Sequence, residues 1–255
     1  MKGIIPCGGR GTRLQPLTHA LPKSILPIHN LPMILYPIKT LIAAGVTDIV
    51  LVANTDHFAH FTKLLGNGRQ FGCNLTYVIQ EEPLGIAHAI KECEHVVKGH
   101  DLAVVLGDNL FFDNFEESVK NFKTGSLIHT VEVNDPERFG VAELDNEMNV
   151  LSLEEKPSEP KSNHAITGFY LFDNTVFDKI NTLEPSARGE YEVTDILKSY
   201  LNEKSLRASK LQHIWADTGT IASLNDASQT VHEYLKENNI NFLYEKSRLI
   251  RPSSV

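Results

Sequence analysis

The chain has 255 residues, of which 42% are hydrophobic, and its formal net charge is −8 at pH 7. This length suits one large α/β domain as well as two small ones, and the composition is that of an ordinary globular protein with ample core. The negative charge argues against nucleic acid or an anionic membrane as the main partner, so any phosphate site must be a local basic pocket.

Three cysteines are present and none belongs to a C-x-x-C pair, which argues against a disulfide scaffold and a structural zinc site. The N-terminus has no hydrophobic stretch long enough for secretion, and no apolar run approaches membrane-spanning length. We therefore expect a cytoplasmic protein with neither nucleic acid nor a membrane as its partner.

A glycine-rich loop follows the first predicted strand, the apolar run at 3–7. The loop and the cations after it comprise Gly8, Gly9, Gly11, Thr12, Arg13 and Lys23. Glycines let the main chain approach a ligand and turn its N–H groups toward one point, and two cations nearby suit a triphosphate. A plain strand-to-helix turn is the alternative, but the flanking cations and prolines favour phosphate binding.

Two common phosphate-binding motifs are excluded in this loop. The dinucleotide fingerprint requires a third glycine at the position that Leu14 occupies, and the P-loop requires a terminal Gly-Lys-Ser/Thr that the loop lacks. The loop therefore belongs to another class of nucleotide site.

Strand-like and helix-like segments alternate through the first half of the chain. Strands are predicted at 48–53, 75–79 and 102–106, and helices at about 33–44, 57–65 and 86–97. This alternation predicts a Rossmann-like three-layer α/β fold, in which a mainly parallel sheet has helices on both faces and a ligand crevice beyond the carboxyl ends of its strands.

The second half is less regular. Strands are predicted at 127–133, 140–144, 150–154 and 168–172, and helices at about 174–181, 192–203 and 221–236. We expect a mixed extension of the sheet that builds a sugar pocket. With no repeat or Gly/Ser linker, 1–255 is predicted to be a single domain. Its nucleotide-binding lobe spans about 1–110 and 210–240, and its sugar-binding lobe spans about 111–209.

Two aspartates are candidate metal ligands. Asp108 follows a predicted strand directly, and Asp217 precedes a predicted helix. Mg²⁺ prefers one or two carboxylates together with phosphate oxygens and waters. Each aspartate has a simpler interpretation, a turn for Asp108 and a helix N-cap for Asp217. Around a phosphate-binding loop, the two together suit a metal that bridges reacting phosphates.

Three further segments carry candidate polar groups. Lys156 suits an attacking phosphate and a neighbouring glutamate suits sugar hydroxyls, although a solvated strand end is the alternative. Arg188 has the same ambiguity. Gln80 carries a donor and an acceptor that match the edge of a pyrimidine, and Gly85 would let a base lie against the main chain. Spacing alone does not favour this base-reading role over a polar loop.

These motifs together resemble those of the sugar-1-phosphate nucleotidyltransferases, most closely the thymidylyltransferase branch. The resemblance extends from Met1 to about residue 230, through the segments 8–18, 107–109, 134–141, 154–162, 185–190 and 217–220. It implies transfer of a nucleoside monophosphate from dTTP to glucose 1-phosphate or a related hexose 1-phosphate, by in-line attack on the α-phosphate with Mg²⁺ as cofactor. It also implies a homo-oligomer, because relatives usually assemble into dimers or tetramers.

The resemblance also implies roles for individual residues. The loop amides and Arg13 would hold the triphosphate, and Lys23 and Lys156 would contact the reacting phosphates. Asp108 and Asp217 would coordinate Mg²⁺. The remaining assignments are base reading by Gln80 and Gly85, and sugar-phosphate binding by Gly140, Glu155, Thr167, Gly168 and Arg188.

The chain departs from this family's pattern at a few positions. His88 replaces a commonly found glutamine, and Pro22 stands where thymidylyl enzymes often have a polar residue. Both are expected near the nucleotide, so UTP stays open as the alternative substrate. A non-catalytic sugar-nucleotide sensor is the other alternative. It predicts loss of the charged groups, whereas Arg13, Lys23 and both aspartates are present.

Overall fold

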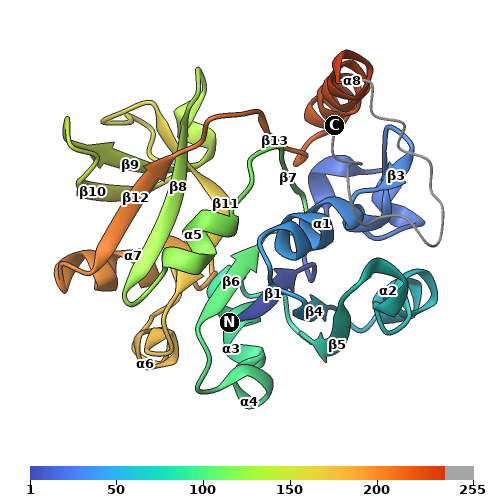
Figure 1. The fold of residues 1–255 in the computed structure, drawn as a ribbon, viewed down its shortest axis with the longest axis horizontal. Helices are drawn as coiled ribbons and strands as arrows, with labels where there is room; N and C mark the ends of the chain where they lie inside the picture. Colours follow the sequence, from blue (N-terminus) through green and yellow to red (C-terminus); the bar gives the residue numbers. More distant parts are fainter. Residues whose placement is uncertain (239–255) are drawn as a thin grey trace.

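A nine-stranded mixed sheet runs through both halves of the chain in a computed structural model that describes residues 1–238 (Figure 1). Its strands follow the order β10-β9-β11-β6-β1-β4-β5, and β8 pairs with β11 and β12. The bounds of the parallel part are β1 (Lys2–Pro6), β4 (Asp48–Ala53), β5 (Asn74–Ile79) and β6 (Leu102–Val105).

Apolar side chains alternate between the two faces of this parallel part, as in a sheet buried on both sides. Ile4 of β1 packs in one hydrophobic cluster, whereas its neighbour Ile5 packs in another. Val104 and Val105 of β6 divide between the same two clusters. The sheet is therefore the middle of three layers.

The second half adds strands around β11, which runs antiparallel to β6, β8 and β9. The bounds are β8 (Ser126–Glu132), β9 (Gly140–Leu144), β10 (Val150–Glu155), β11 (His164–Phe172) and β12 (Leu206–Lys210). Figure 1 shows these strands gathered on one side of β6, with β1, β4 and β5 on the other.

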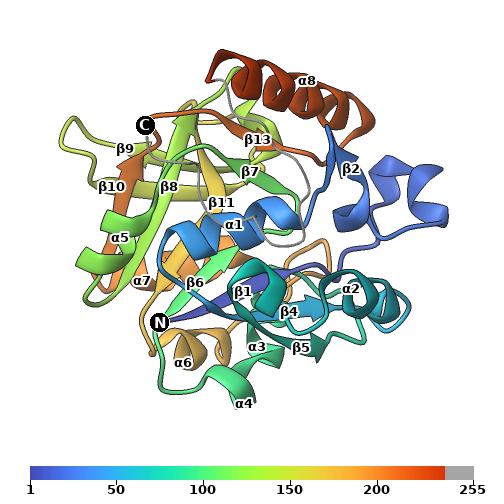
Figure 2. The ribbon, with the colours of Figure 1, turned by 45° about the vertical axis from the view of Figure 1, so that its right-hand side comes forward.

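Helices cover the sheet on both faces (Figure 2). The α-helices are α1 (Leu35–Ala43), α2 (Phe58–Leu65), α3 (Ile86–Glu92), α4 (Glu94–Val97), α5 (Glu116–Asn121), α6 (Val176–Ile180), α7 (Val193–Asn202) and α8 (Ile221–Glu237). Short 3₁₀ helices lie at Thr12–Leu14, Leu17–His19, Lys23–Ile25, Arg69–Phe71 and Pro136–Arg138. No helix within residues 1–238 has the length and apolarity needed to cross a bilayer.

Two small ribbons lie outside the main sheet. One pairs β2 (Pro27–Ile28) with β3 (Leu31–Pro32), and the other pairs β7 (Asn109–Phe111) with β13 (Trp215–Asp217). The β7–β13 pair is antiparallel, with Asp217 opposite Asn109. It joins the end of β6 to the start of α8, although the paired residues are more than 100 positions apart in the sequence.

The predicted α/β class, the mixed sheet and its three layers are confirmed. Several details differ from the sequence prediction. The helix expected at 86–97 is divided at Cys93 into α3 and α4, and β11 begins at His164 rather than near 168. The strands β7, β12 and β13 and the helix α5 were not predicted. The division into two lobes stays a prediction. Residues 239–255 of the predicted domain lie outside the part of the chain that the structure describes.

Candidate active site

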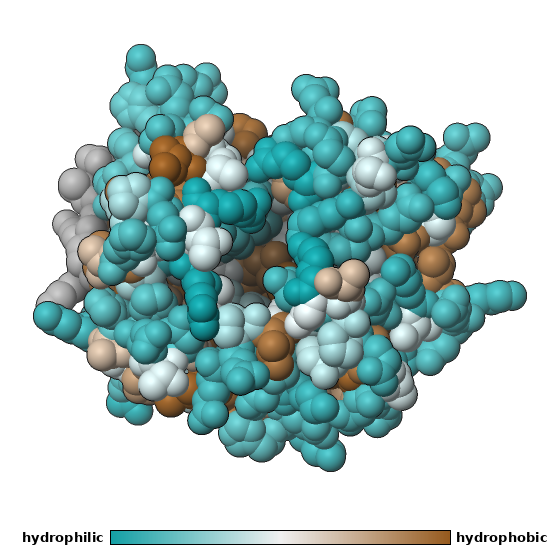
Figure 3. All heavy atoms as spheres, turned by 180° about the vertical axis from the view of Figure 1, so that it is seen from behind, coloured by the Kyte–Doolittle hydropathy of each residue, from teal (hydrophilic) through white to brown (hydrophobic). Residues whose placement is uncertain are grey.

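Two cavities that share residues open at the carboxyl ends of β1 and β6. The larger has a volume of about 350 Å³ and the smaller about 190 Å³. Figure 3 shows the hollow on the face opposite to that of Figure 1, with hydrophilic side chains around its rim. The larger cavity is lined by the predicted residues Gly8, Gly9, Gly11, Thr12, Arg13, Lys23, Gln80, Gly85, Asp108, Glu155, Lys156 and Arg188.

The smaller cavity brings in the second group of predicted residues. Gly140, Gly168 and Asp217 line it, and it shares Arg13, Asp108, Glu155 and Lys156 with the larger cavity. Arg13, Lys156 and Asp108 therefore lie where the two cavities meet, with Lys23 in the larger cavity and Asp217 in the smaller. This is the arrangement that two anionic substrates reacting with each other would need.

The glycine-rich loop is tied to its surroundings through its main chain. The carbonyl oxygen of Gly8 accepts a hydrogen bond from the Asn54 side chain at 3.3 Å. Gly11 has a φ of +62°, which favours glycine, and its carbonyl accepts a hydrogen bond from the Thr18 hydroxyl at 2.8 Å. Neither donor residue, Asn54 or Thr18, lines the cavity, so the partners of these two carbonyl groups lie outside it.

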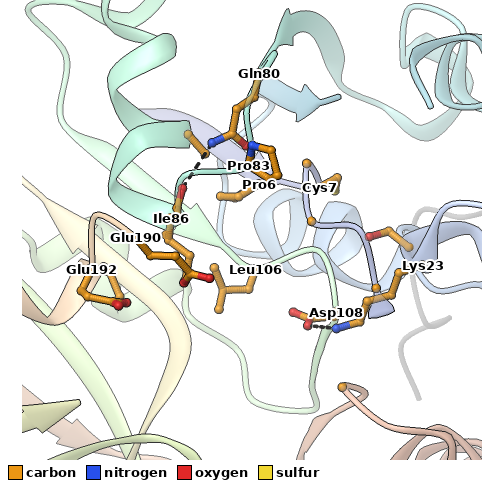
Figure 4. A pocket seen from close by; sticks show the side chains of 18 of the residues that line it. Pro6, Cys7, Lys23, Gln80, Pro83, Ile86, Leu106, Asp108, Glu190 and Glu192 are labelled. Carbon is orange, nitrogen blue, oxygen red and sulfur yellow. Dashed lines mark hydrogen bonds and ion pairs between the residues drawn. The ribbon is translucent and has the colours of Figure 1, made fainter. Parts of the chain in front are cut away.

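Lys23 and Asp108 form an ion pair in the larger cavity (Figure 4). The other Asp108 oxygen accepts a hydrogen bond from the Asn109 side chain at 3.0 Å. Burial alone would raise the pKa of the Asp108 carboxyl, but Lys23 and Asn109 outweigh burial and hold this pKa below its usual range. Asp108 is therefore a carboxylate at neutral pH.

Asp217 lies close enough to Asp108 to interact with it electrostatically. Burial, followed by the charge of Asp108, raises the pKa of Asp217 to about 6, although Lys23, Arg13 and Arg138 act in the opposite direction. The backbone fixes this proximity, because the amide of Thr218 donates to the carbonyl oxygen of Asp108 at 3.0 Å. Thr220 caps α8. Asp217 is therefore not the N-cap that its position before the helix suggested.

The chemistry of these donors fits a hard cation. A carboxylate has about four lone-pair sites, so Asp108 retains acceptor capacity beyond its bonds to Lys23 and Asn109. Among residues 1–238, no group of three or more His, Cys, Asp and Glu side chains could hold a metal by itself. A pair of carboxylates suits an ion that completes its shell with phosphate oxygens and waters, as Mg²⁺ does.

Glu155 is the central carboxylate of the smaller cavity. One of its oxygens accepts a hydrogen bond from the Thr194 hydroxyl, and the other lies 3.1 Å from the Lys156 ammonium. Gly140 pairs with Glu155 across β9 and β10, and a Cβ at Gly140 would lie 3.3 Å from the carboxylate. Glycine therefore leaves the space beside Glu155 open to a ligand.

Arg188 lies on the wall of the larger cavity, where carboxylates hold it. Its Nη2 donates to both Glu192 oxygens, at 2.8 and 2.9 Å, and lies 3.5 Å from Glu155. An anionic ligand must therefore compete with Glu192 for this guanidinium. Thr167 lines neither cavity, because its side chain is fully buried and its hydroxyl donates to the carbonyl oxygen of His129.

Two residues at the site, Arg138 and Asn109, are not among the residues predicted from the sequence. Arg138 lies 3.8 Å from Asp217 and lines the smaller cavity as a further cation. Asn109 is almost fully buried, and its Oδ1 accepts from the Gly168 amide at 3.1 Å and from the Trp215 indole N–H at 2.7 Å. Both residues lie in segments that carry the family resemblance, which was the available signal.

Known proteins resemble this chain over nearly its whole length. A family model described as Nucleotidyl transferase matches residues 2–234. A glucose-1-phosphate thymidylyltransferase from Neisseria gonorrhoeae is 43% identical over 237 residues, which is 91% of this chain and 82% of the relative. One from Mycolicibacterium smegmatis is 43% identical over 238 residues, with the same two shares.

Two solved structures are also similar to this chain, and both cover more than nine-tenths of it. A crystal structure assigned as a Bacillus anthracis glucose-1-phosphate thymidylyltransferase, in complex with sucrose, superposes with a TM-score of 0.88 at 40% identity. It covers 97% of this chain and 98% of its own. A UDP-glucose pyrophosphorylase complexed with UDP-glucose, 24% identical, shares the fold with a TM-score of 0.80 over 91% of this chain and 98% of its own.

Proposed function

The chain belongs to the nucleotidyl transferase family, and from this premise we propose that it transfers a thymidylyl group from dTTP to glucose 1-phosphate, releasing pyrophosphate. The observation that carries the proposal is the junction of the two cavities. Arg13, Lys156 and Asp108 line both cavities there, Lys23 pairs with Asp108, and the Asp217 carboxylate lies close enough to Asp108, Lys23 and Arg13 to interact with them electrostatically.

In the proposed reaction, a phosphate oxygen of glucose 1-phosphate attacks the α-phosphorus of dTTP. The bond from that phosphorus to the oxygen bridging the α- and β-phosphates breaks on the opposite side, and this oxygen leaves with pyrophosphate. The nucleophile is already an anion, so no general base is required. The barrier arises largely from bringing anions together, so positioning and charge neutralisation are the main sources of catalysis.

The side chains divide this work by position. The amides of the loop at Gly8–Gly11 and the guanidinium of Arg13 hold the triphosphate, and Lys23 neutralises charge beside Asp108. Lys156 lines both cavities, which suits a cation between the attacking and the attacked phosphate. Arg138 contributes positive charge near Asp217.

We further propose Mg²⁺ as the cofactor, held by Asp108 and Asp217 with phosphate oxygens and water. When bound, it would neutralise charge on the reacting phosphates. The Asp108–Lys23 ion pair and the Asn109 hydrogen bond keep Asp108 ionised and oriented.

The smaller cavity is proposed to hold the hexose. The open space that Gly140 leaves beside Glu155 suits sugar hydroxyls, which donate to a carboxylate. Arg188 reaches the sugar phosphate only by leaving Glu192 in part, since both oxygens of Glu192 now hold it. We also propose that the protein works in the cytoplasm and forms a homo-oligomer, as the family resemblance implies.

A pyrophosphate-release panel tests the proposed reaction. Purified protein is combined with dTTP, UTP, dCTP or dATP and with glucose 1-phosphate or its epimers, with Mg²⁺ present, and the sugar nucleotide is identified by mass. The expected result is fastest turnover for dTTP with glucose 1-phosphate. Fastest turnover with UTP would make the protein a uridylyltransferase, and binding without release in every combination would make it a sugar-nucleotide sensor.

A further inference from the structure

Gln80 presents one end of its carboxamide to the larger cavity and buries the other. It follows β5 directly, is 3% exposed and lines the larger cavity (Figure 4). Its Nε2 lies 3.3 Å from the carbonyl oxygen of Gly85. A carbonyl oxygen only accepts, so the nitrogen end of the carboxamide must face Gly85.

The opposite end of the same carboxamide points toward the phosphate loop. A Cβ placed on Gly8 would lie only 2.3 Å from the Gln80 Oε1, so this oxygen lies directly over Gly8. Gly8 lines the same cavity. Within residues 1–238, this oxygen accepts no side-chain or main-chain hydrogen bond, so it is available to a ligand.

His88 reinforces this orientation of the Gln80 carboxamide. Its Nδ1 lies 2.9 Å from the Gln80 Nε2. Since that amide nitrogen only donates, Nδ1 must be the acceptor, and the ring proton therefore resides on Nε2. The His88 Nε2, which carries this proton, lies 3.3 Å from a carboxylate oxygen of Glu92. The ring also stacks on Tyr191, with 6.2 Å between centroids.

From these contacts we propose that His88 is a positioning residue, which orients the Gln80 side chain and thereby contributes to the choice of nucleotide base. Together with the Gly85 carbonyl, its Nδ1 lone pair holds the Gln80 carboxamide with Oε1 toward the nucleotide, so the cavity prefers a base whose edge carries an imide N–H. Thymine and uracil carry this donor at N3, whereas cytosine has an acceptor there. The inference rests on the proposed function and adds the selection of keto-pyrimidines by a residue that does not touch the base.

The test compares nucleotide binding in three variants of His88. His88→Phe keeps a ring that stacks on Tyr191 but lacks the acceptor. His88→Asn keeps an acceptor near the position of Nδ1, and His88→Leu removes both ring and acceptor. His95→Phe is the matched control, because His95 is exposed on the neighbouring helix α4. The dissociation constants of dTTP and dCTP are measured by calorimetry, so that the readout does not depend on turnover.

His88→Phe is expected to lower the dTTP-over-dCTP binding preference by about tenfold, which corresponds to about 1.4 kcal/mol. His88→Asn and His95→Phe are expected to retain the wild-type preference. If His88→Phe does not fold, the comparison of His88→Leu with His88→Asn decides the same question. An unchanged preference in the Phe or Leu variant would overturn the inference. Failure of wild-type protein to release pyrophosphate would instead overturn the proposed function.

Discussion

Replacing Asn109 tests whether the site depends on one buried amide. This side chain joins three elements, because its Oδ1 accepts from the Gly168 amide of β11 and the Trp215 indole of β13, and its Nδ2 donates to Asp108. Asn109→Leu has a similar volume but leaves two donors without acceptors. An unsatisfied buried donor costs roughly 1–3 kcal/mol. Gly168 is buried and Trp215 half-buried, so the expected loss of unfolding free energy is about 2–4 kcal/mol.

The matched variant is Asn109→Asp, which keeps the acceptor and loses the donor to Asp108. It is expected to retain more stability than Asn109→Leu. It is also expected to release pyrophosphate more slowly than wild type, because a second carboxylate beside Asp108 repels it. Urea unfolding gives the stability and pyrophosphate release gives the activity. Wild-type stability in Asn109→Leu, or wild-type activity in Asn109→Asp, would refute the role assigned to this amide.

Four other outcomes follow from the same structure. Asp108→Asn should lower kcat by about 10²–10³ without unfolding the protein, by analogy with loss of one preorganised electrostatic group, and near-normal pyrophosphate release would contradict the assignment. Removing divalent cations with a chelator should abolish pyrophosphate release and added Mg²⁺ should restore it, whereas full activity in chelator would exclude the proposed cofactor. Gly85→Ala should lower Tm more than Gly99→Ala. Both glycines have a positive φ, but only at Gly85 would the added Cβ clash, at 2.6 Å from the carbonyl oxygen of Tyr191. Equal losses of Tm in the two variants would disprove this clash. Burial lowers the pKa of His129 to about 4 from 6.5, so at this residue the unfolded chain takes up the proton first. The unfolding free energy of wild type minus that of His129→Phe, from urea titrations, should therefore fall by about 3 kcal/mol as the pH drops through that range, and a difference independent of pH would contradict the buried neutral imidazole.

The sequence predicted the parallel part of the fold well because its signals are local. β4 matches the predicted 48–53 run, since a buried parallel strand is a nearly continuous apolar segment between turns. The ribbon of β7 and β13 was not predictable in this way. Each strand has only three residues, and the pairing of Asp217 with Asn109 joins positions 108 apart, which no periodicity encodes.

The same limit explains what could be predicted of the site. The loop glycines, Arg13 and Lys23 all lie between positions 8 and 23 of the sequence, so their common cavity followed from one motif. The interaction of Asp217 with Asp108 depends on the ribbon, so residue types alone could not separate a metal ligand from a helix cap. The pairing of Arg188 with Glu192 was also not predicted, because a loop has no fixed spacing that makes two side chains face each other.

Binding of Mn²⁺ as a paramagnetic substitute for Mg²⁺ tests the central claim, that two carboxylates and the surrounding cations form a metal–nucleotide site. Electron paramagnetic resonance is used to titrate Mn²⁺ into wild-type protein and into Asp217→Asn, each with dTTP present. About one bound ion per chain is expected, with an affinity at least about tenfold weaker in the variant, the change that loss of about 1.4 kcal/mol represents. Equal affinities in the two proteins would contradict this claim.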